Sequence, residues 1–175
     1  MGYAGGTAPD PTYDLLGDHT ECIQVDYDPA RIPYEDLVEA FWAVHSPLKP
    51  ALSTQYASLI LCHDAEQLSV ARASRERVAG RVGRRVHTEV RMLDRFYVAE
   101  DYHQKHALRG DSVLVSEVHG YCRDEASLRD STAAARLNGY AYGLGSRVRV
   151  EMDIESLGLS DVGARHLRSI VRNGR

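Results

Sequence analysis

Three side chains in the first third of the sequence have the chemistry to act together on one oxygen atom. Glu21 opens the run ECIQVDYDP, whose alternation predicts a strand with Glu21 on the same face as Ile23 and Val25. Burial among apolar side chains disfavours a charged carboxylate, and a carboxylic acid kept neutral donates a proton or a hydrogen bond. Tyr13 and Tyr56 are candidate phenolic donors to the same pocket. The alternative interpretation is a glutamate at a strand end with its carboxylate in water.

A second polar cluster lies in AEDYHQK, where Asp101 and His103 are close along the chain. These side chains fit a hydrogen-bond network or a proton shuttle. The alternative interpretation is a solvated acidic turn. The Cys–His pairs in LCHD and HGYC have no second pair at the spacing of a zinc site, so no metal is expected.

The 175 residues, 43% hydrophobic and 26% charged, suit a soluble globular domain with a small appendage. A net charge of -4 argues against a nucleic-acid partner, because phosphate binding needs clustered Lys and Arg. No run approaches the ~20 apolar residues of a membrane span, and no signal peptide is visible. We therefore expect Cys22, Cys62 and Cys122 to be reduced thiols of a cytoplasmic protein with no membrane contact.

Periodicity predicts an α/β arrangement for the first part of the chain. The predicted elements are a strand in ECIQVDYDP, an amphipathic helix in IPYEDLVEAFWAVHSP, a strand buried on both faces from Gln55 to Cys62, a helix capped by Asp64 and stopped by Gly80, and a strand in RVHTEVRML.

The periodic pattern of hydrophobic residues stops between Arg109 and Asp124. This change predicts two domains, residues 1–109 and a helical extension over residues 124–175. The extension is expected to contain one helix in DEASLRDSTAAARLNGY and a second that begins at Ser160 and ends before Gly174.

Six stretches, taken in order, bring a family into view: GYAGGTAPDPTY, GDHTE, VDYDP, YEDLVEAFW, TQYASLI and FYVAEDYHQK. Together they resemble the A-type peptide methionine sulfoxide reductases from Gly2 to about Lys105. The tail segments RDSTAAARLNGY and SLGLS are similar to the C-terminal extension of a longer subfamily. The resemblance implies an α/β (α+β) fold, a ferredoxin-like sandwich that here lacks its first strand and first helix and ends in the helical extension.

The resemblance also implies thiol chemistry on methionine-S-sulfoxide. In the family, a cysteine in a Gly-Cys-Phe-Trp motif attacks the sulfur, and a glutamate with help from tyrosines protonates the oxygen, which leaves as water. The cysteine becomes a sulfenic acid that thiols then reduce. By motif, Glu21 matches the proton donor, and Tyr13 and Tyr56 match the oxygen-binding tyrosines.

The Gly-Cys-Phe-Trp motif comes ahead of the glycine turn in the family, whereas this sequence opens at that turn. Three origins are open: a valine codon read as a start, an upstream selenocysteine codon read as a stop, or a real truncation. We expect a protein-repair reductase that works when the upstream cysteine is present and is inactive as the 175 residues stand. The alternative is a catalytically dead relic or a methionine-sulfoxide-binding module.

None of the three cysteines is expected to replace the nucleophile. Cys22 follows Glu21, and consecutive strand residues point to opposite faces. Cys62 is about six residues from Tyr56 along a predicted strand that rises ~3.3 Å per residue, so its thiol is out of reach of Tyr56. Cys122 lies in a segment without helix or strand periodicity, and a mobile resolving thiol is one interpretation of it.

The resemblance implies no bound cofactor and an external thiol reductant, either thioredoxin or dithiothreitol. We expect a monomer for the complete protein. For this chain self-association is expected, because the first strand of a ferredoxin-like sheet is central and its loss exposes strand edges.

Overall fold

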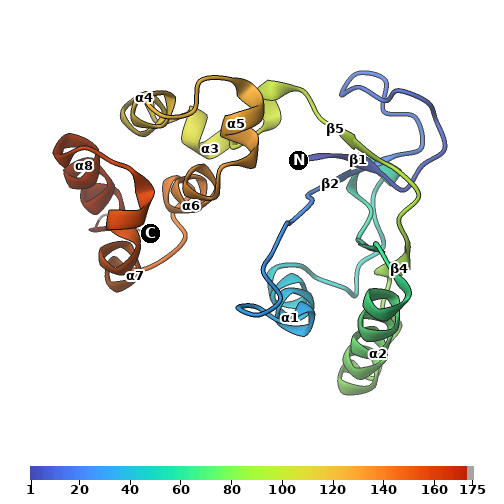
Figure 1. The fold of residues 1–175 in the computed structure, drawn as a ribbon. Helices are drawn as coiled ribbons and strands as arrows, with labels where there is room; N and C mark the ends of the chain where they lie inside the picture. The colour runs from blue at the N-terminus through green and yellow to red at the C-terminus, as the bar shows by residue number, and fades with distance from the viewer. Residues whose placement is uncertain (173–175) are drawn as a thin grey trace. The chain divides into compact units, whose positions relative to one another are not determined.

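The structure, a computed structural model, describes residues 1–172 and divides the chain into two compact units, Met1–Ala99 and Glu100–Arg175. The division lies ahead of the predicted change between Arg109 and Asp124, because the short helices that begin after Ala99 pack on helices of the second unit. Helices and small sheets make up the chain, which confirms the predicted α+β class (Figure 1).

The first unit contains a three-stranded antiparallel sheet in the order β2-β1-β5. Its strands are β1 (Gly2–Ala4), β2 (Thr20–Cys22) and β5 (Phe96–Val98). β1 is central, with Tyr3 opposite Glu21 on one side and opposite Tyr97 on the other. The strand predicted to run through ECIQVDYDP therefore ends early, and Ile23, which was expected on a buried face, is 76% exposed.

A second, parallel sheet joins β3 (Leu59–Cys62) to β4 (Glu89–Met92). The prediction of one strand from Gln55 to Cys62, buried on both faces, is wrong. Its first part is the 3-10 turn η1 (Thr54–Tyr56), and within β3 only Cys62 is fully buried. The reason is that β3 pairs with a strand on one side alone in the described part of the chain, so its other edge stays open.

Two helices complete the first unit, α1 (Tyr34–Val44) and α2 (Ala65–Val82). They pack on each other through the apolar cluster Val38, Trp42, Val78 and Val86. The predicted cap of α2 is confirmed, since the Asp64 carboxylate accepts from the Gln67 N–H at 2.8 Å. The helix passes the predicted stop at Gly80 and ends at Val82, and its C-cap is Gly83, whose φ of 62° is a left-handed conformation that favours glycine.

The second unit consists of short helices around one apolar core (Figure 1). They are η2 (Asp101–His103), α3 (His106–Arg109), α4 (Ser112–His119), α5 (Glu125–Asp130), α6 (Thr132–Ala141), α7 (Arg147–Asp153), η3 (Ile154–Leu157) and α8 (Asp161–Arg172). The single helix predicted over DEASLRDSTAAARLNGY is two helices, because Ser131 is extended and caps α6. The predicted end at Gly174 lies outside the described residues.

Candidate functional site

A polar clamp holds the glycine turn at the end of β1. The Asp18 carboxylate accepts hydrogen bonds from the Thr7 and Ala8 N–H groups, both at 2.8–2.9 Å, and from the Thr7 hydroxyl. These bonds lower the pKa of Asp18 from 3.8 to about 2. A Cβ at Gly6 would lie 2.4 Å from the Asp18 Oδ1 atom, so the turn accepts only glycine there.

The buried side chain of His19 also holds this turn through hydrogen bonds to its backbone. The side chain is 1% exposed, its Nδ1 accepts from the Gly6 N–H at 3.1 Å, and its Nε2 lies 2.8 Å from the Ala8 carbonyl oxygen. Because Nδ1 accepts, Nε2 carries the proton and donates to that carbonyl. Together, Asp18 and His19 fix the backbone that leads from the glycine turn to β2.

Glu21 follows this clamp on β2 and is half-buried. Its Oε1 atom accepts a hydrogen bond from the Gln55 Nε2 atom at 2.7 Å, and the neighbouring Thr20 hydroxyl donates to the Thr54 carbonyl at 2.7 Å. These two bonds join β2 to η1. They orient the carboxyl group, whose Oε1 atom the Gln55 amide holds.

The two tyrosines reach the surface from different segments. Tyr56 ends η1, directly after Gln55, and is 62% exposed. Tyr13 lies in the loop between the glycine turn and Asp18 and is 43% exposed. The structure thus brings the Tyr56 segment against β2 through Gln55, whereas Tyr13 belongs to the loop whose base Asp18 and His19 clamp.

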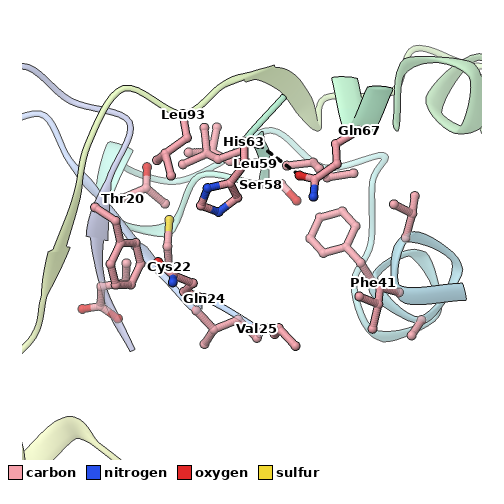
Figure 2. A pocket seen from close by; sticks show the side chains of 18 of the residues that line it. Thr20, Cys22, Gln24, Val25, Phe41, Ser58, Leu59, His63, Gln67 and Leu93 are labelled. Atoms are coloured by element: carbon pink, nitrogen blue, oxygen red, sulfur yellow. Dashed lines mark hydrogen bonds between the residues drawn. The ribbon is translucent and has the colours of Figure 1, made fainter. Parts of the chain in front are cut away.

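A cavity of about 690 Å³ lies beside β2 (Figure 2). Its lining comes from residues 20–25, from one side of α1 and from residues 57–61, with Met1, Tyr27, His63, Gln67, Leu93 and Phe96. Figure 2 shows Gln24 and Val25 on one side and Phe41 of α1 across from them. Among the described lining residues Glu21 is the one acidic side chain, and Tyr13 and Tyr56 are not part of the lining.

The cysteines differ in their surroundings. Cys22 lines the same cavity as Glu21, so the prediction that it faces away is wrong; the cavity follows the open edge of β2, where neighbours from both faces contribute. Burial raises the pKa of Cys22 to about 11. Burial also raises the pKa of Cys62, whose Sγ lies 3.6 Å from the Tyr34 hydroxyl. Both thiols therefore stay protonated near neutral pH.

Cys122 is a core residue of the second unit. Its side chain is 4% exposed within the apolar cluster, and its Sγ donates to the Ser127 carbonyl at 3.6 Å. The mobile resolving thiol considered from the sequence is therefore not what the structure shows at this position.

Asp101 and His103 both lie in η2 of the second unit. Asp101 is exposed and His103 is half-buried, with its ring 4.2 Å from that of Tyr102. The His103 N–H donates to the Glu100 carbonyl at 3.0 Å, which closes a turn at the start of this unit.

Sequence reasoning missed three residues that build the site: Asp18, His19 and Gln55. GDHTE contained a usable signal, since an aspartate and a histidine shortly after a glycine turn are acceptors for its backbone N–H groups. Gln55 carried no such signal, because its bond to Glu21 joins residues that are far apart in sequence.

Over the described residues, no group of three or more His, Cys, Asp or Glu side chains is placed to hold a metal ion. The helices described for residues 1–172 include none long and apolar enough to cross a membrane.

The fold and site define a mixed α/β protein with an amide-held carboxyl group at the edge of an open sheet. A family model described as "Peptide methionine sulfoxide reductase" matches residues 1–134. The chain therefore belongs to the peptide methionine sulfoxide reductase family.

Relatives from distant organisms agree with this assignment. The chain is 41% identical over 162 residues to a "Peptide methionine sulfoxide reductase" of Drosophila melanogaster, covering 91% of this chain and 65% of the relative. It is 38% identical over 147 residues to a "Peptide methionine sulfoxide reductase A5" of Oryza sativa subsp. japonica, covering 81% and 57%. A relative from Haloquadratum walsbyi, "Peptide methionine sulfoxide reductase MsrA", is 39% identical over 127 residues, covering 67% and 73%. The chain thus spans 57% to 65% of the length of the first two relatives.

Proposed function

We propose that this chain carries the oxygen-binding and proton-donating part of a methionine-S-sulfoxide reductase site used in protein repair. Glu21 is the proton donor, and Tyr13 and Tyr56 donate hydrogen bonds to the sulfoxide oxygen. The observation that carries the proposal is the 2.7 Å bond from Gln55 to Glu21, in a chain of the reductase family. This bond fixes one carboxyl oxygen and so presents the other at a defined place beside the cavity.

The attacking thiol is, in this proposal, none of the three cysteines of the chain. Cys62 and Cys122 are buried, and burial keeps the Cys22 thiol protonated. A Gly-Cys-Phe-Trp segment supplies the thiol instead. Overall, two thiols are oxidised to one disulfide while a sulfoxide becomes a thioether and its oxygen leaves as water.

The partners follow from this chemistry. The reductant is an external dithiol, thioredoxin in the cell or dithiothreitol in the test tube, and no cofactor is bound. A reducing cytoplasm suits three free cysteines. Asp101 and His103 are assigned to a supporting hydrogen-bond network in the complete site. The names of the relatives favour this enzyme over a protein that only binds methionine sulfoxide.

Turnover of the S-epimer of methionine sulfoxide with dithiothreitol tests the proposal in three forms of the protein. These are the 175-residue chain, the chain with a family segment fused ahead of Met1 that carries the first strand, the Gly-Cys-Phe-Trp motif and the first helix, and the same fusion with that cysteine changed to serine. Turnover is expected in the second form alone. Activity of the first form that is lost on Cys22→Ser, or a folded fusion without turnover, would contradict the proposal.

A further inference from the structure

A second, smaller cavity of about 350 Å³ adjoins the one described above and differs from it in charge. Thr20, Ala57 and Leu59 line both cavities, so a ligand in the smaller one lies next to the larger. Among the described lining residues of the smaller cavity, Glu89 and Arg91 of β4 are the charged ones. The rest of its lining is apolar or carries hydroxyl groups: Thr20, Ala51, Ser53, Thr54, Ala57 and Leu59.

Glu89 and Arg91 form an ion pair that a ligand can enter. They lie two positions apart on one face of β4, with the Arg91 Nε atom 3.6 Å from the Glu89 Oε2 atom. The Glu89 side chain is 66% exposed and the Arg91 side chain is 44% exposed, so water screens their attraction and the pair contributes little to stability. A ligand that offers a new partner to each of them therefore opens the pair at little cost.

The Arg91 guanidinium reaches from β4 to the glycine turn of the other sheet. A Cβ at Gly5 would lie 2.8 Å from the Arg91 Nη2 atom, and Gly5 directly follows β1, which pairs with β2. Burial raises the pKa of Cys22 to about 11, and the positive charge of Arg91 acts on this thiol in the opposite direction. The guanidinium therefore lies close to β2, the strand that carries Glu21.

We propose that this smaller cavity binds the α-carboxylate and α-ammonium groups of free methionine-S-sulfoxide, an inference that rests on the proposed function. Arg91 pairs with the carboxylate and Glu89 with the ammonium group, so each end of the ligand meets a charge of opposite sign. The substrate side chain then passes Thr20 toward Glu21. These two residues are consecutive, and methionine sulfoxide is long enough to span the ~3.8 Å between neighbouring Cα atoms.

The pairing of opposite charges favours a free amino acid over other ligands. Within a polypeptide, the nitrogen and the carbonyl of methionine sulfoxide belong to uncharged amides, which would leave both Glu89 and Arg91 without a new partner. A ligand with a negative charge alone would be attracted by Arg91 and repelled by Glu89, which lies 3.6 Å from it. The cavity thus selects for the two charged ends together.

An NMR titration of the isotope-labelled 175-residue chain tests the binding without any turnover. Free methionine-S-sulfoxide should shift the amide signals of Thr20 and Glu89 and the Arg91 Nε–H signal. Free methionine, which has the same two charged ends, should shift the same signals. N-acetyl-methionine-S-sulfoxide N-methylamide keeps the sulfoxide but has neither charge, and it should leave these signals in place.

Two substitutions assign the ends of the ligand in the fusion that carries the family segment. Arg91→Gln should raise KM about tenfold or more for the free substrate and for its N-acetyl form, which keeps the carboxylate. Glu89→Gln should raise KM for the free substrate and for its N-methylamide, which keeps the ammonium group. Neither change should alter KM for the doubly blocked compound. Arg77→Gln is the matched control, since Arg77 forms an exposed ion pair with Glu39, 3.4 Å apart, between α2 and α1.

Three results would overturn the proposal. They are a folded chain whose cavity signals do not respond to free methionine-S-sulfoxide, equal shifts with the doubly blocked compound, and an equal rise of KM for the free and the doubly blocked substrates in Arg91→Gln. A fusion that turns over none of these substrates would be a failure of the proposed reductase chemistry. The NMR titration of the 175-residue chain would then decide this inference alone.

Discussion

Glu21 combines a fixed orientation with a place at the edge of a cavity. The Gln55 amide donates to one carboxyl oxygen, so in the proposed reaction the proton comes from the other. The position of Glu21 on β2, directly after the clamp made by Asp18 and His19, limits the backbone motion that would blur this geometry. The chemistry assigned to this residue is therefore testable by substitutions that keep its shape.

Glu21→Gln keeps the shape of the side chain but removes the acidic proton. In the fusion that carries Gly-Cys-Phe-Trp, turnover should fall by roughly 10²–10⁴-fold, the usual contribution of general acid catalysis, while KM changes little. Tyr13→Phe and Tyr56→Phe should each cost less, because each removes one of several donors to the same oxygen. Steady-state kinetics with the S-epimer measure both effects. Near-normal turnover of Glu21→Gln would leave this carboxyl group with a structural role only.

Asp18 should make the glycine turn sensitive to acid. Hydrogen bonds from the N–H groups of Ala8 and Thr7 lower its pKa from 3.8 to about 2, so the charged carboxylate is the form that folding favours. Its contribution to stability is therefore complete above pH 3.8 and is lost as the pH falls through about 2. Thermal melting of the wild type and of Asp18→Asn should differ near neutral pH and converge at about pH 2. Asp14→Asn, an exposed aspartate of the same loop, is the control. A constant difference at all pH values would contradict the assignment.

The site could be predicted from the sequence as far as residue chemistry and motif order reach. Glu21, Tyr13 and Tyr56 are visible because their types are unusual for their positions and because the motifs around them occur in order. The buried apolar face expected around Glu21 does not exist, since β2 ends at Cys22 and Ile23 is exposed. Gln55 holds Glu21 in place through a contact that no local pattern encodes.

At the scale of single elements, the cap of α2 is the clearest local determinant. The Asp64 carboxylate accepts from the Gln67 N–H, and the Gln67 side chain accepts from the His63 N–H at 3.0 Å. Asp64→Ala should lower the free energy of unfolding of the first unit by about 0.5–2 kcal/mol, and Asp64→Asn, which keeps an acceptor, by much less. Trp42 fluorescence reports the result, because this single tryptophan donates from Nε1 to the Ser74 hydroxyl of α2. Equal shifts of the denaturation midpoint for both variants would show that the cap contributes little.

Helices with one apolar face were predictable because their signal is local. α1 and α2 begin where proline and an aspartate cap predict, and α1 buries Val38 and Trp42 as its periodicity requires. β1 and β5 were not predicted, since each has three residues and is a strand only through pairing with residues distant in the sequence. Gly2 and Val98 pair across these strands although they lie near opposite ends of the amino-acid sequence of the first unit. Pairing at that separation leaves no periodic trace in a short sequence window.

At the scale of the whole molecule, the two units differ in how far apart in sequence their contacting residues lie. In the first unit the central strand β1 has two neighbours, β2 from the early part of the unit's sequence and β5 from its end. The second unit is built from consecutive short helices with short connections. Contacts between distant residues form slowly, because the loop that they close must be ordered first.

The central place of β1 therefore sets an order of events when the chain folds. In pulse-labelled hydrogen exchange during refolding, amides of α6 and α8 should gain protection before those of Tyr3 and Ala4. Simultaneous protection of both units would contradict this order. On the ribosome, β1 can acquire β2 early, but it stays open on its other side until Phe96–Val98 have left the exit tunnel.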